Sequence, residues 1–102
     1  MRSLIIRVLL KLVASRSNNP TYKVGCIIRK GYRFYFGWNM IDTIHAEDMA
    51  LSKVPDPSGA VMYCSWSPCK NCEKLIMDAG ISRLRYGWKY PGNPRPLVGL
   101  PL

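Results

Sequence analysis

The chain has 102 residues, of which 48% are apolar and 21% are charged, so we expect one folded domain and exclude both intrinsic disorder and a multi-domain architecture. Fifteen Lys and Arg against six Asp and Glu give a formal net charge of +9. This charge favours anionic partners such as a nucleotide or nucleic acid, although scattered basic residues are also typical of a solvated surface. No uncharged apolar run approaches the ~20 residues of a membrane span, so we expect no membrane partner.

The first half of the chain predicts one helix and one hairpin. Residues 3–16 place apolar side chains at helical spacing and predict an amphipathic helix that packs on a core. Residues 17–20, Ser-Asn-Asn-Pro, end this helix. Residues 24–29 and 32–38 predict two antiparallel strands joined by a tight turn at Lys30-Gly31. The alternating aromatic side chains of the second strand are expected to form core beneath a helix, and these are Tyr32, Phe34, Phe36 and Trp38.

A second helix is predicted directly after the hairpin, over residues 44–53. Asp42 or Thr43 can serve as its N-cap. His45 and Glu47 then lie in its first turn.

The next strand and helix carry the cysteine pair. Residues 60–64 are short and apolar and predict a third strand. Ser67 suits an N-cap and Pro68 suits the first helical position. Cys69 and Cys72 are therefore expected in the opening turn of a third helix. The partial positive charge at a helix N-terminus favours the thiolate form of a cysteine.

The end of the chain predicts one more strand and an irregular tail. Gly80 ends the third helix, and residues 81–86 predict a fourth strand. Strands connected through helices favour parallel pairing. Four prolines after residue 90 exclude a regular helix or a central strand and predict an extended arm. We therefore expect a domain over residues 1–90 and a proline-rich tail over residues 91–102.

The residue types and spacing of His45, Cys69 and Cys72 predict a catalytic zinc site. Three protein ligands leave a fourth coordination position open for water, which separates a catalytic zinc from a structural one. Zinc lowers the pKa of a bound water toward ~7. Glu47 lies two residues beyond His45, so it need not bind the metal and can instead serve as the general acid and base.

Two other interpretations of the cysteines remain open. In the first, Cys26 or Cys64 completes a four-ligand structural zinc site. In the second, Cys69 and Cys72 form a redox pair without metal, which leaves His45 and Glu47 unexplained. A Cys-x-x-Cys beside a His-x-Glu favours metal chemistry over a disulfide framework, and a reducing cytoplasm is the expected location.

The order and spacing of these segments resemble the cytidine deaminase superfamily, and most nearly its deoxycytidylate deaminase branch. The matching segments are Val24-Gly25-Cys26-Ile27-Ile28, Gly37-Trp38-Asn39, His45-Ala46-Glu47, Ser67-Pro68-Cys69-Lys70-Asn71-Cys72, and Ala79-Gly80-Ile81 leading to Tyr86. The resemblance implies a three-layer α/β fold with a mixed β-sheet and helices on both faces. The family normally adds a helix and a strand after the fourth strand, so we expect a C-terminally truncated version. Its sheet edge after residue 88 would be open or covered by a neighbour in a homo-oligomer.

The resemblance also implies a reaction and a substrate pocket. The reaction is the zinc-dependent hydrolytic deamination of a cytosine nucleotide, most nearly dCMP to dUMP plus ammonia. Zinc-bound hydroxide would attack C4, and Glu47 would protonate N3 and then the departing ammonia. Asn39 would hydrogen-bond the sugar, and Ser67 favours cytosine over a purine. The implied substrate-binding residues are Asn39, Val24, Gly25, Cys26, Ala46, Ser65, Trp66, Ser67 and Tyr86.

Two alternative functions follow from the same segment. Ser65-Trp66-Ser67-Pro68-Cys69 also resembles the polynucleotide cytosine deaminases of the AID and APOBEC group, in which Trp66 would form an aromatic wall of the base pocket. Together with the net charge, this makes single-stranded DNA or RNA the alternative substrate. A non-catalytic, zinc-stabilised nucleic-acid-binding module on the same fold is the second alternative.

Overall fold

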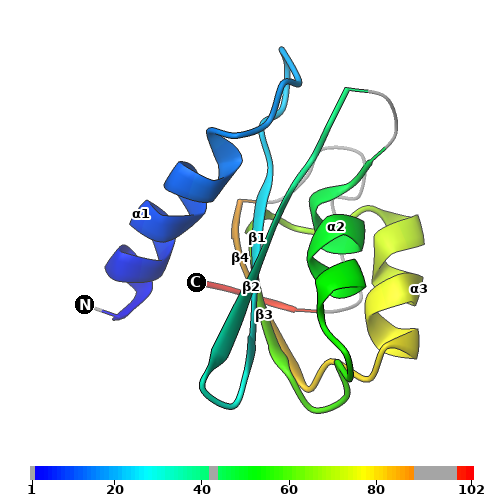
Figure 1. Ribbon diagram of the computed structural model, residues 1–102. Coiled ribbons are helices and arrows are strands. Elements are labelled where there is room, and N and C mark those ends of the chain that lie inside the picture. The colour runs from blue at the N-terminus through cyan, green and yellow to red at the C-terminus, as the bar shows by residue number, and fades with distance from the viewer. Residues whose placement is uncertain (1, 42–43, 89–98) are drawn as a thin grey trace.

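The computed structural model describes residues 2–41, 44–88 and 99–102, and these form three helices and one five-stranded sheet (Figure 1). The strands lie in the order β2-β1-β3-β4-β5. In chain order the elements are α1 (Arg2–Ala14), β1 (Gly25–Lys30), β2 (Arg33–Trp38), α2 (Ala46–Lys53), β3 (Val61–Trp66), α3 (Lys70–Asp78), β4 (Arg83–Trp88) and β5 (Leu100–Pro101).

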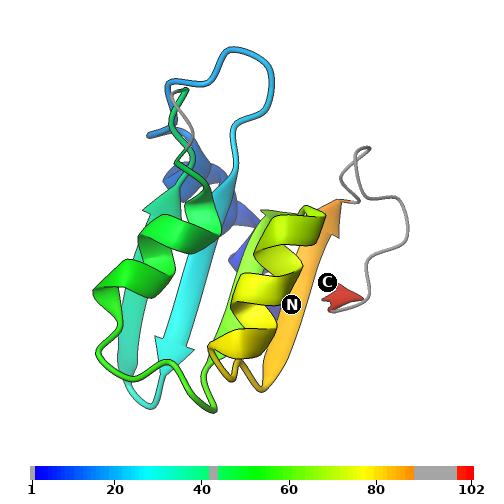
Figure 2. The same ribbon diagram turned by 90° about the vertical axis from the view of Figure 1, so that its right-hand side faces the viewer.

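The sheet forms the middle of three layers. Helix α1 lies on one face, and α2 and α3 lie side by side on the other (Figures 1 and 2). The predicted three-layer α/β fold with a mixed sheet is therefore confirmed. Within the described ranges, no helix has both the length and the apolar character that crossing a bilayer requires.

The strand pairing follows from the connections between the strands. β1 pairs antiparallel with β2, as predicted for the hairpin, and also antiparallel with β3. The chain leaves β2, passes through α2 and returns as β3 on the far side of β1, so β2 and β3 run in the same direction without being neighbours. The predicted parallel pairing is found between β3 and β4, which α3 connects.

The main core contains side chains of the sheet and of helices α2 and α3. All of its members are less than a tenth exposed to solvent, and it includes two cysteines that the zinc motif does not use. Its members are Cys26, Ile28, Ala46, Ala50, Val54, Ala60, Met62, Cys64, Ile76 and Leu84. The core thus supports the N-terminal ends of both helices that carry the zinc motif.

The prediction that Tyr32, Phe34, Phe36 and Trp38 form core was wrong, since Trp38 is only partly buried and Tyr35 is the aromatic residue of β2 that packs against the core. Phe34 and Phe36 are 52% and 41% exposed, and Tyr32 is fully exposed. The reason is that β2 is an edge strand, while α1 packs chiefly over β1 and β3. The residue of β2 that is buried is Gly37, which packs against α2.

Helix α1 also leaves a large apolar surface uncovered by the described residues. It buries Leu10 and Ala14, while five other aliphatic side chains are between 41% and 64% exposed. A helix that is apolar all round is normally buried all round. Together with two residues of β2, these side chains form what we call the α1–β2 face, which consists of Leu4, Ile5, Val8, Leu9, Leu12, Phe34 and Phe36.

The helices of the zinc motif begin later than predicted. Strand β3 runs on to Trp66, and the backbone N–H of Ser67 donates to the carbonyl of Trp88, so Ser67 belongs to the end of the strand. The N-cap of α3 is therefore Cys69, and not Ser67. Helix α2 has His45 as its N-cap. The expected caps Asp42 and Thr43 lie outside the described residues.

The sheet edge beyond β4 is not open, in contrast to the prediction. Residues 100 and 101 form β5, which pairs parallel to β4, and the backbone N–H of Leu102 donates to the carbonyl of Tyr86 at 2.8 Å. The proline-rich composition allows this because a two-residue strand at a sheet edge needs few backbone donors. Residues 91–98 of the predicted tail lie outside the described residues, and the domain boundary at residue 90 stays a prediction.

Gly37 sets the distance between α2 and the sheet. A Cβ at this position would meet the Ala46 carbonyl oxygen and would lie 2.5 Å from the Ala50 backbone nitrogen. We predict that Gly37→Ala lowers the free energy of unfolding by about 1–3 kcal/mol, since the helix must move off the strand. Urea unfolding measures this loss. Gly31→Asn is the control, because a Cβ at Gly31 meets no atom within 4 Å and asparagine tolerates its left-handed backbone. An unchanged stability of Gly37→Ala would contradict the prediction.

Candidate active site

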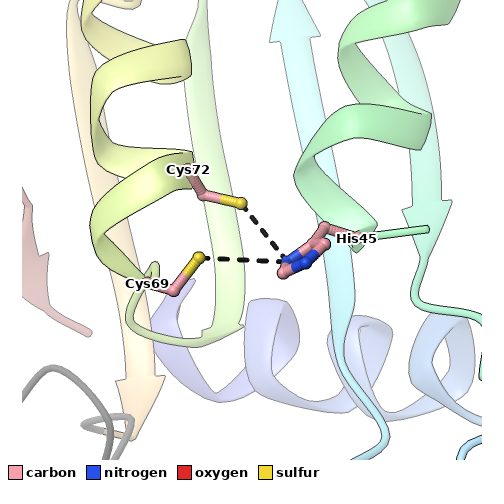
Figure 3. Close-up of side chains that lie close together, drawn as sticks. All are labelled: His45, Cys69 and Cys72. Carbon is pink, nitrogen blue, oxygen red and sulfur yellow. Dashed lines mark hydrogen bonds between the residues drawn. The ribbon is translucent and has the colours of Figure 1, made fainter. Parts of the chain in front are cut away.

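The predicted zinc ligands come together where the N-termini of α2 and α3 meet. His45 is the N-cap of α2, Cys69 is the N-cap of α3, and Cys72 lies in the first turn of α3. The Nδ1 atom of His45 lies 3.5 Å from the Cys72 sulfur and 3.9 Å from the Cys69 sulfur (Figure 3). Three residues that are up to 27 positions apart in the chain thus direct their donor atoms toward one point.

This geometry fits a tetrahedral zinc ion. Zinc binds a histidine nitrogen at about 2.0–2.1 Å and a thiolate at about 2.3 Å, which places nitrogen and sulfur ligands roughly 3.6 Å apart. The two observed distances bracket that value. All three donor atoms lie within 4.8 Å of one another, and in the described part of the chain they are the one such group.

The thiol of Cys72 needs a neighbouring cation to ionise. Burial, and after it the Glu47 carboxylate, raise the pKa of this thiol far above its usual range. A divalent metal supplies the opposing positive charge, and metal binding and thiol deprotonation are therefore coupled. The surroundings of Cys69 and Cys72 therefore favour two thiolates bound to a metal ion over two free thiols.

Cys26 and Cys64 are placed apart from the three ligands. They face each other across β1 and β3, with sulfur atoms 3.5 Å apart, and both are fully buried. Neither belongs to the group of donor atoms around His45. Burial raises the pKa of the Cys26 thiol. The described residues thus offer no fourth cysteine ligand, and the four-ligand structural site receives no support.

Glu47 lies beside the ligands with its carboxyl group out of solvent. Its side chain is 4% exposed, and it lines the same cavity as His45 and Cys69. Burial raises the pKa of this carboxyl group, while hydrogen bonds from its own backbone and the charge of His45 oppose the increase. A carboxyl group in such surroundings is suited to exchange protons with a bound molecule.

A cavity of about 260 Å³ opens beside the ligand group. This is close to the lower end of the ~300–1,000 Å³ that is usual for small-molecule sites. The predicted site residues that line it are Val24, Asn39, His45, Ala46, Glu47, Trp66, Ser67 and Cys69. The predicted zinc ligand Cys72 does not belong to its lining. Nor do the predicted substrate-binding residues Gly25, Cys26, Ser65 and Tyr86, whose contact with a substrate stays a prediction.

Two of the predicted substrate-binding residues make hydrogen bonds that hold the backbone around the cavity in place. The Oγ of Ser65 accepts from the backbone N–H of Gly25 at 2.9 Å and so joins β3 to β1 inside the core. The amide of Asn39 accepts from the N–H of Val24 at 2.8 Å and donates to the carbonyl of Tyr22 at 2.7 Å. Asn39 therefore holds the segment before β1 in place.

The sequence did not identify several residues that line the cavity. Asn19 and Tyr22 come from the loop between α1 and β1, and the remaining three, Met40, Ile41 and Ile44, flank the gap before α2. The one available signal was the Asn-Asn-Pro segment, because asparagine side chains commonly hold the backbone of turns. None of the described lining residues is a lysine or arginine.

A family model for the cytidine and deoxycytidylate deaminase zinc-binding region matches residues 2–88 of the chain. The deoxycytidylate deaminases of Enterobacteria phages T2 and T4 are each 37% identical to it over 60 residues, which is 55% of this chain. That match covers 32% and 31% of the two phage proteins, so the chain spans about a third of the length of these curated relatives.

Solved structures show the same fold over nearly the whole chain. The apo crystal structure of dCMP deaminase from cyanophage S-TIM5 superposes with a TM-score of 0.76 at 26% identity, covering 96% of this chain and 93% of that one. RibD of Acinetobacter baumannii superposes with a TM-score of 0.76 at 24% identity, covering 93% of this chain and 29% of that one. The similarity to RibD is a similarity of fold alone.

Proposed function

The chain belongs to the cytidine and deoxycytidylate deaminase zinc-binding family, and on this premise we propose that it hydrolyses the amino group of a cytosine nucleotide, converting dCMP to dUMP and ammonia. The observation that carries the proposal is the meeting of His45, Cys69 and Cys72 beside the buried Glu47 at one cavity. A three-ligand zinc site next to a carboxylate is the arrangement that hydrolytic deamination requires.

The proposed roles follow from where the side chains lie. His45, Cys69 and Cys72 hold the zinc, which supplies a nucleophilic hydroxide near neutral pH when it is bound. Glu47 takes up the proton that the attacking water loses and delivers it to N3 of the base. It then takes the proton of the hydroxyl group that has been added at C4 and carries it to the amino group, which leaves as ammonia while C4 becomes the carbonyl carbon of dUMP. Its burial keeps these transfers away from bulk water.

The cavity favours a single nucleotide as the substrate. Its volume of about 260 Å³ suits one base and its sugar, and Trp66 supplies a flat apolar wall. Asn39 retains one N–H for the sugar. The two curated phage relatives are named as deoxycytidylate deaminases, which supports dCMP as the first substrate to test.

The phosphate-binding residues must come from beyond the described cavity lining, which contains no lysine or arginine. Lys23 is close along the chain, and its Nζ donates to the carbonyl of Ser17 at 3.0 Å, so it is held near the cavity loop. Arg29 donates to the carbonyl of Gly31, at the hairpin turn. Of these two, Lys23 is our candidate for the phosphate contact.

A panel of four substrates tests the proposal: dCMP, dCTP, deoxycytidine and a cytosine-containing single-stranded oligonucleotide. We expect the highest kcat/KM with dCMP and a lower one with deoxycytidine, because the phosphate adds binding energy. Turnover of the oligonucleotide alone would establish the polynucleotide alternative and overturn the proposal. Oligonucleotide binding and bound zinc without any ammonia release would instead establish the non-catalytic module.

The thiolate ligands are consistent with a reducing cytoplasm, which we propose as the location.

We further propose that the chain forms a homo-oligomer through the α1–β2 face. The seven side chains of this face are apolar. The exposed ridge of α1 borders a groove that is lined by Leu9, Leu12 and Phe36 and also by Arg16 and Lys53. A ridge next to a groove on one face is self-complementary about a two-fold axis. A patch of this extent marks an interaction site more often than a free surface.

Sedimentation equilibrium tests this proposal through its salt dependence. The charged residues that line the groove beside this face are Arg16 and Lys53, so two such faces bring like charges together around an apolar centre. We predict that salt strengthens the association of two copies by screening this repulsion. Val8→Glu should give a monomer, whereas Met77→Glu, on the exposed side of α3, should not. A wild-type protein that stays monomeric at all salt concentrations would contradict the proposal. Binding of an anionic partner to the α1–β2 face that weakens as salt is added would also contradict it, because that partner would then cover the face in place of a second copy.

A further inference from the structure

Two aromatic rings form a corner at the cavity that the mechanism does not use. The rings of Tyr22 and Trp66 meet edge to face, with centroids 5.3 Å apart and an angle of 85° between the planes. Both residues line the cavity that contains Glu47. On its other side, Trp66 contacts Trp88 with centroids 5.9 Å apart. The ring of Trp66 is therefore held between two aromatic neighbours. Of these two, Tyr22 lines the cavity and Trp88 does not.

The backbone of Tyr22 is fixed by two asparagine side chains. The Oδ1 of Asn19 accepts from the backbone N–H of Tyr22 at 3.0 Å and from that of Thr21 at 2.9 Å. The Nδ2 of Asn39 donates to the Tyr22 carbonyl at 2.7 Å. Both backbone groups of Tyr22 are thus bound, in a loop with no regular secondary structure. Such bonding orders the loop, so the ring is held in position before any ligand arrives.

The surrounding contacts show why an ordered ring matters here. Trp66 ends β3 and is partly exposed, so the core does not enclose its ring on every side. The edge-to-face contact with Tyr22 restricts the rotation of this ring. A flat base that enters the cavity then meets an aromatic wall whose orientation is already set.

We propose that Tyr22 is a positioning residue that acts through Trp66 to set substrate affinity. This rests on the proposed function, because the ligand that the wall receives is the cytosine base. The contact exists equally with bound substrate and in the transition state, so its loss raises KM and leaves kcat nearly unchanged. An aromatic pair of this kind corresponds to a rise in KM of roughly three- to ten-fold.

A double-mutant cycle on the zinc-loaded protein tests the proposal. The variants are Tyr22→Leu, Trp66→Leu and the pair, assayed with dCMP and with deoxycytidine as substrate or competitive inhibitor. We expect Tyr22→Leu to raise KM in the wild-type background and to add nothing in the Trp66→Leu background, since coupled residues are not additive. The rise should be equal for both ligands, because the wall faces the base and not the phosphate.

The ring-retaining variant Tyr22→Phe separates positioning from a structural role. We expect it to keep KM within about two-fold of the wild type, because the aromatic ring is preserved. A Tyr22→Phe variant as impaired as Tyr22→Leu would assign the effect to the hydroxyl group and overturn the proposal. Additive effects in the cycle, or a fall in kcat alone, would overturn it as well.

Should Tyr22→Leu fail to fold, Tyr22→His takes its place in the cycle. If the wild type binds dCMP without turning it over, the proposed function fails, and the cycle is then measured through tryptophan fluorescence on dCMP binding.

Discussion

Replacing Glu47 with glutamine is expected to lower kcat for dCMP by about 10²–10⁴-fold, the usual range for a general acid and base. Glutamine keeps the size of the buried side chain but cannot take up and release the proton. Because Glu47 does not belong to the group of metal-ligand atoms, the variant should retain its zinc. Steady-state kinetics and metal analysis of the same preparation measure both quantities.

Asp48→Asn is the matched control for this prediction. Asp48 is the next residue in the first turn of α2, and it is exposed where Glu47 is buried. Its replacement removes the same charge at nearly the same place, so a general electrostatic effect would appear in both variants. We expect the control to stay within a few-fold of the wild type. Equal activity of Glu47→Gln and the wild type would remove Glu47 from the mechanism.

Replacing Cys72 with serine is expected to remove the zinc and to destabilise the fold. Serine is a poor ligand for zinc, and two remaining ligands hold the ion weakly. At free zinc concentrations 100 to 1,000 times the dissociation constant, the lost binding corresponds to about 3–4 kcal/mol of stability. Metal analysis and thermal unfolding with and without added zinc measure the two effects.

Cys64→Ala tests whether Cys64 is a fourth zinc ligand in addition to His45, Cys69 and Cys72. Cys64 is as buried as Cys72, but its sulfur lies against Cys26 and not against the ligand group. We therefore expect the variant to bind about one zinc per chain, as the wild type does. Loss of zinc in Cys64→Ala would instead support the four-ligand structural site.

The sequence predicted the residues of the site better than it predicted the surfaces around it. His45, Cys69 and Cys72 were identifiable because metal ligands occur as short motifs of few residue types. The start of α3 lies two residues later than predicted, because Ser67 has the residue type of a cap but its backbone N–H bonds to the carbonyl of Trp88. Hydrogen bonds between distant strands cannot be read from local propensity.

The burial of apolar residues was the less predictable part. The aromatic pattern of β2 correctly indicated a strand, but it could not show that β2 lies at the sheet edge, where α1 covers it less than it covers β1 and β3. In the same way, the periodicity of α1 predicted the helix without showing that Leu10 and Ala14 face the sheet and Val8 faces outward. Tyr22 was missed because its position depends on Asn39, which is 17 residues away.

Product analysis shows whether the zinc site of this chain deaminates a cytosine nucleotide. The purified, zinc-loaded protein is incubated with dCMP, and dUMP and ammonia are quantified over time. We expect both products to form in equal amounts, a chelator to stop their formation and added zinc to restore it. If folded, zinc-loaded protein leaves every cytosine nucleotide of the panel unchanged, the site does not deaminate these nucleotides.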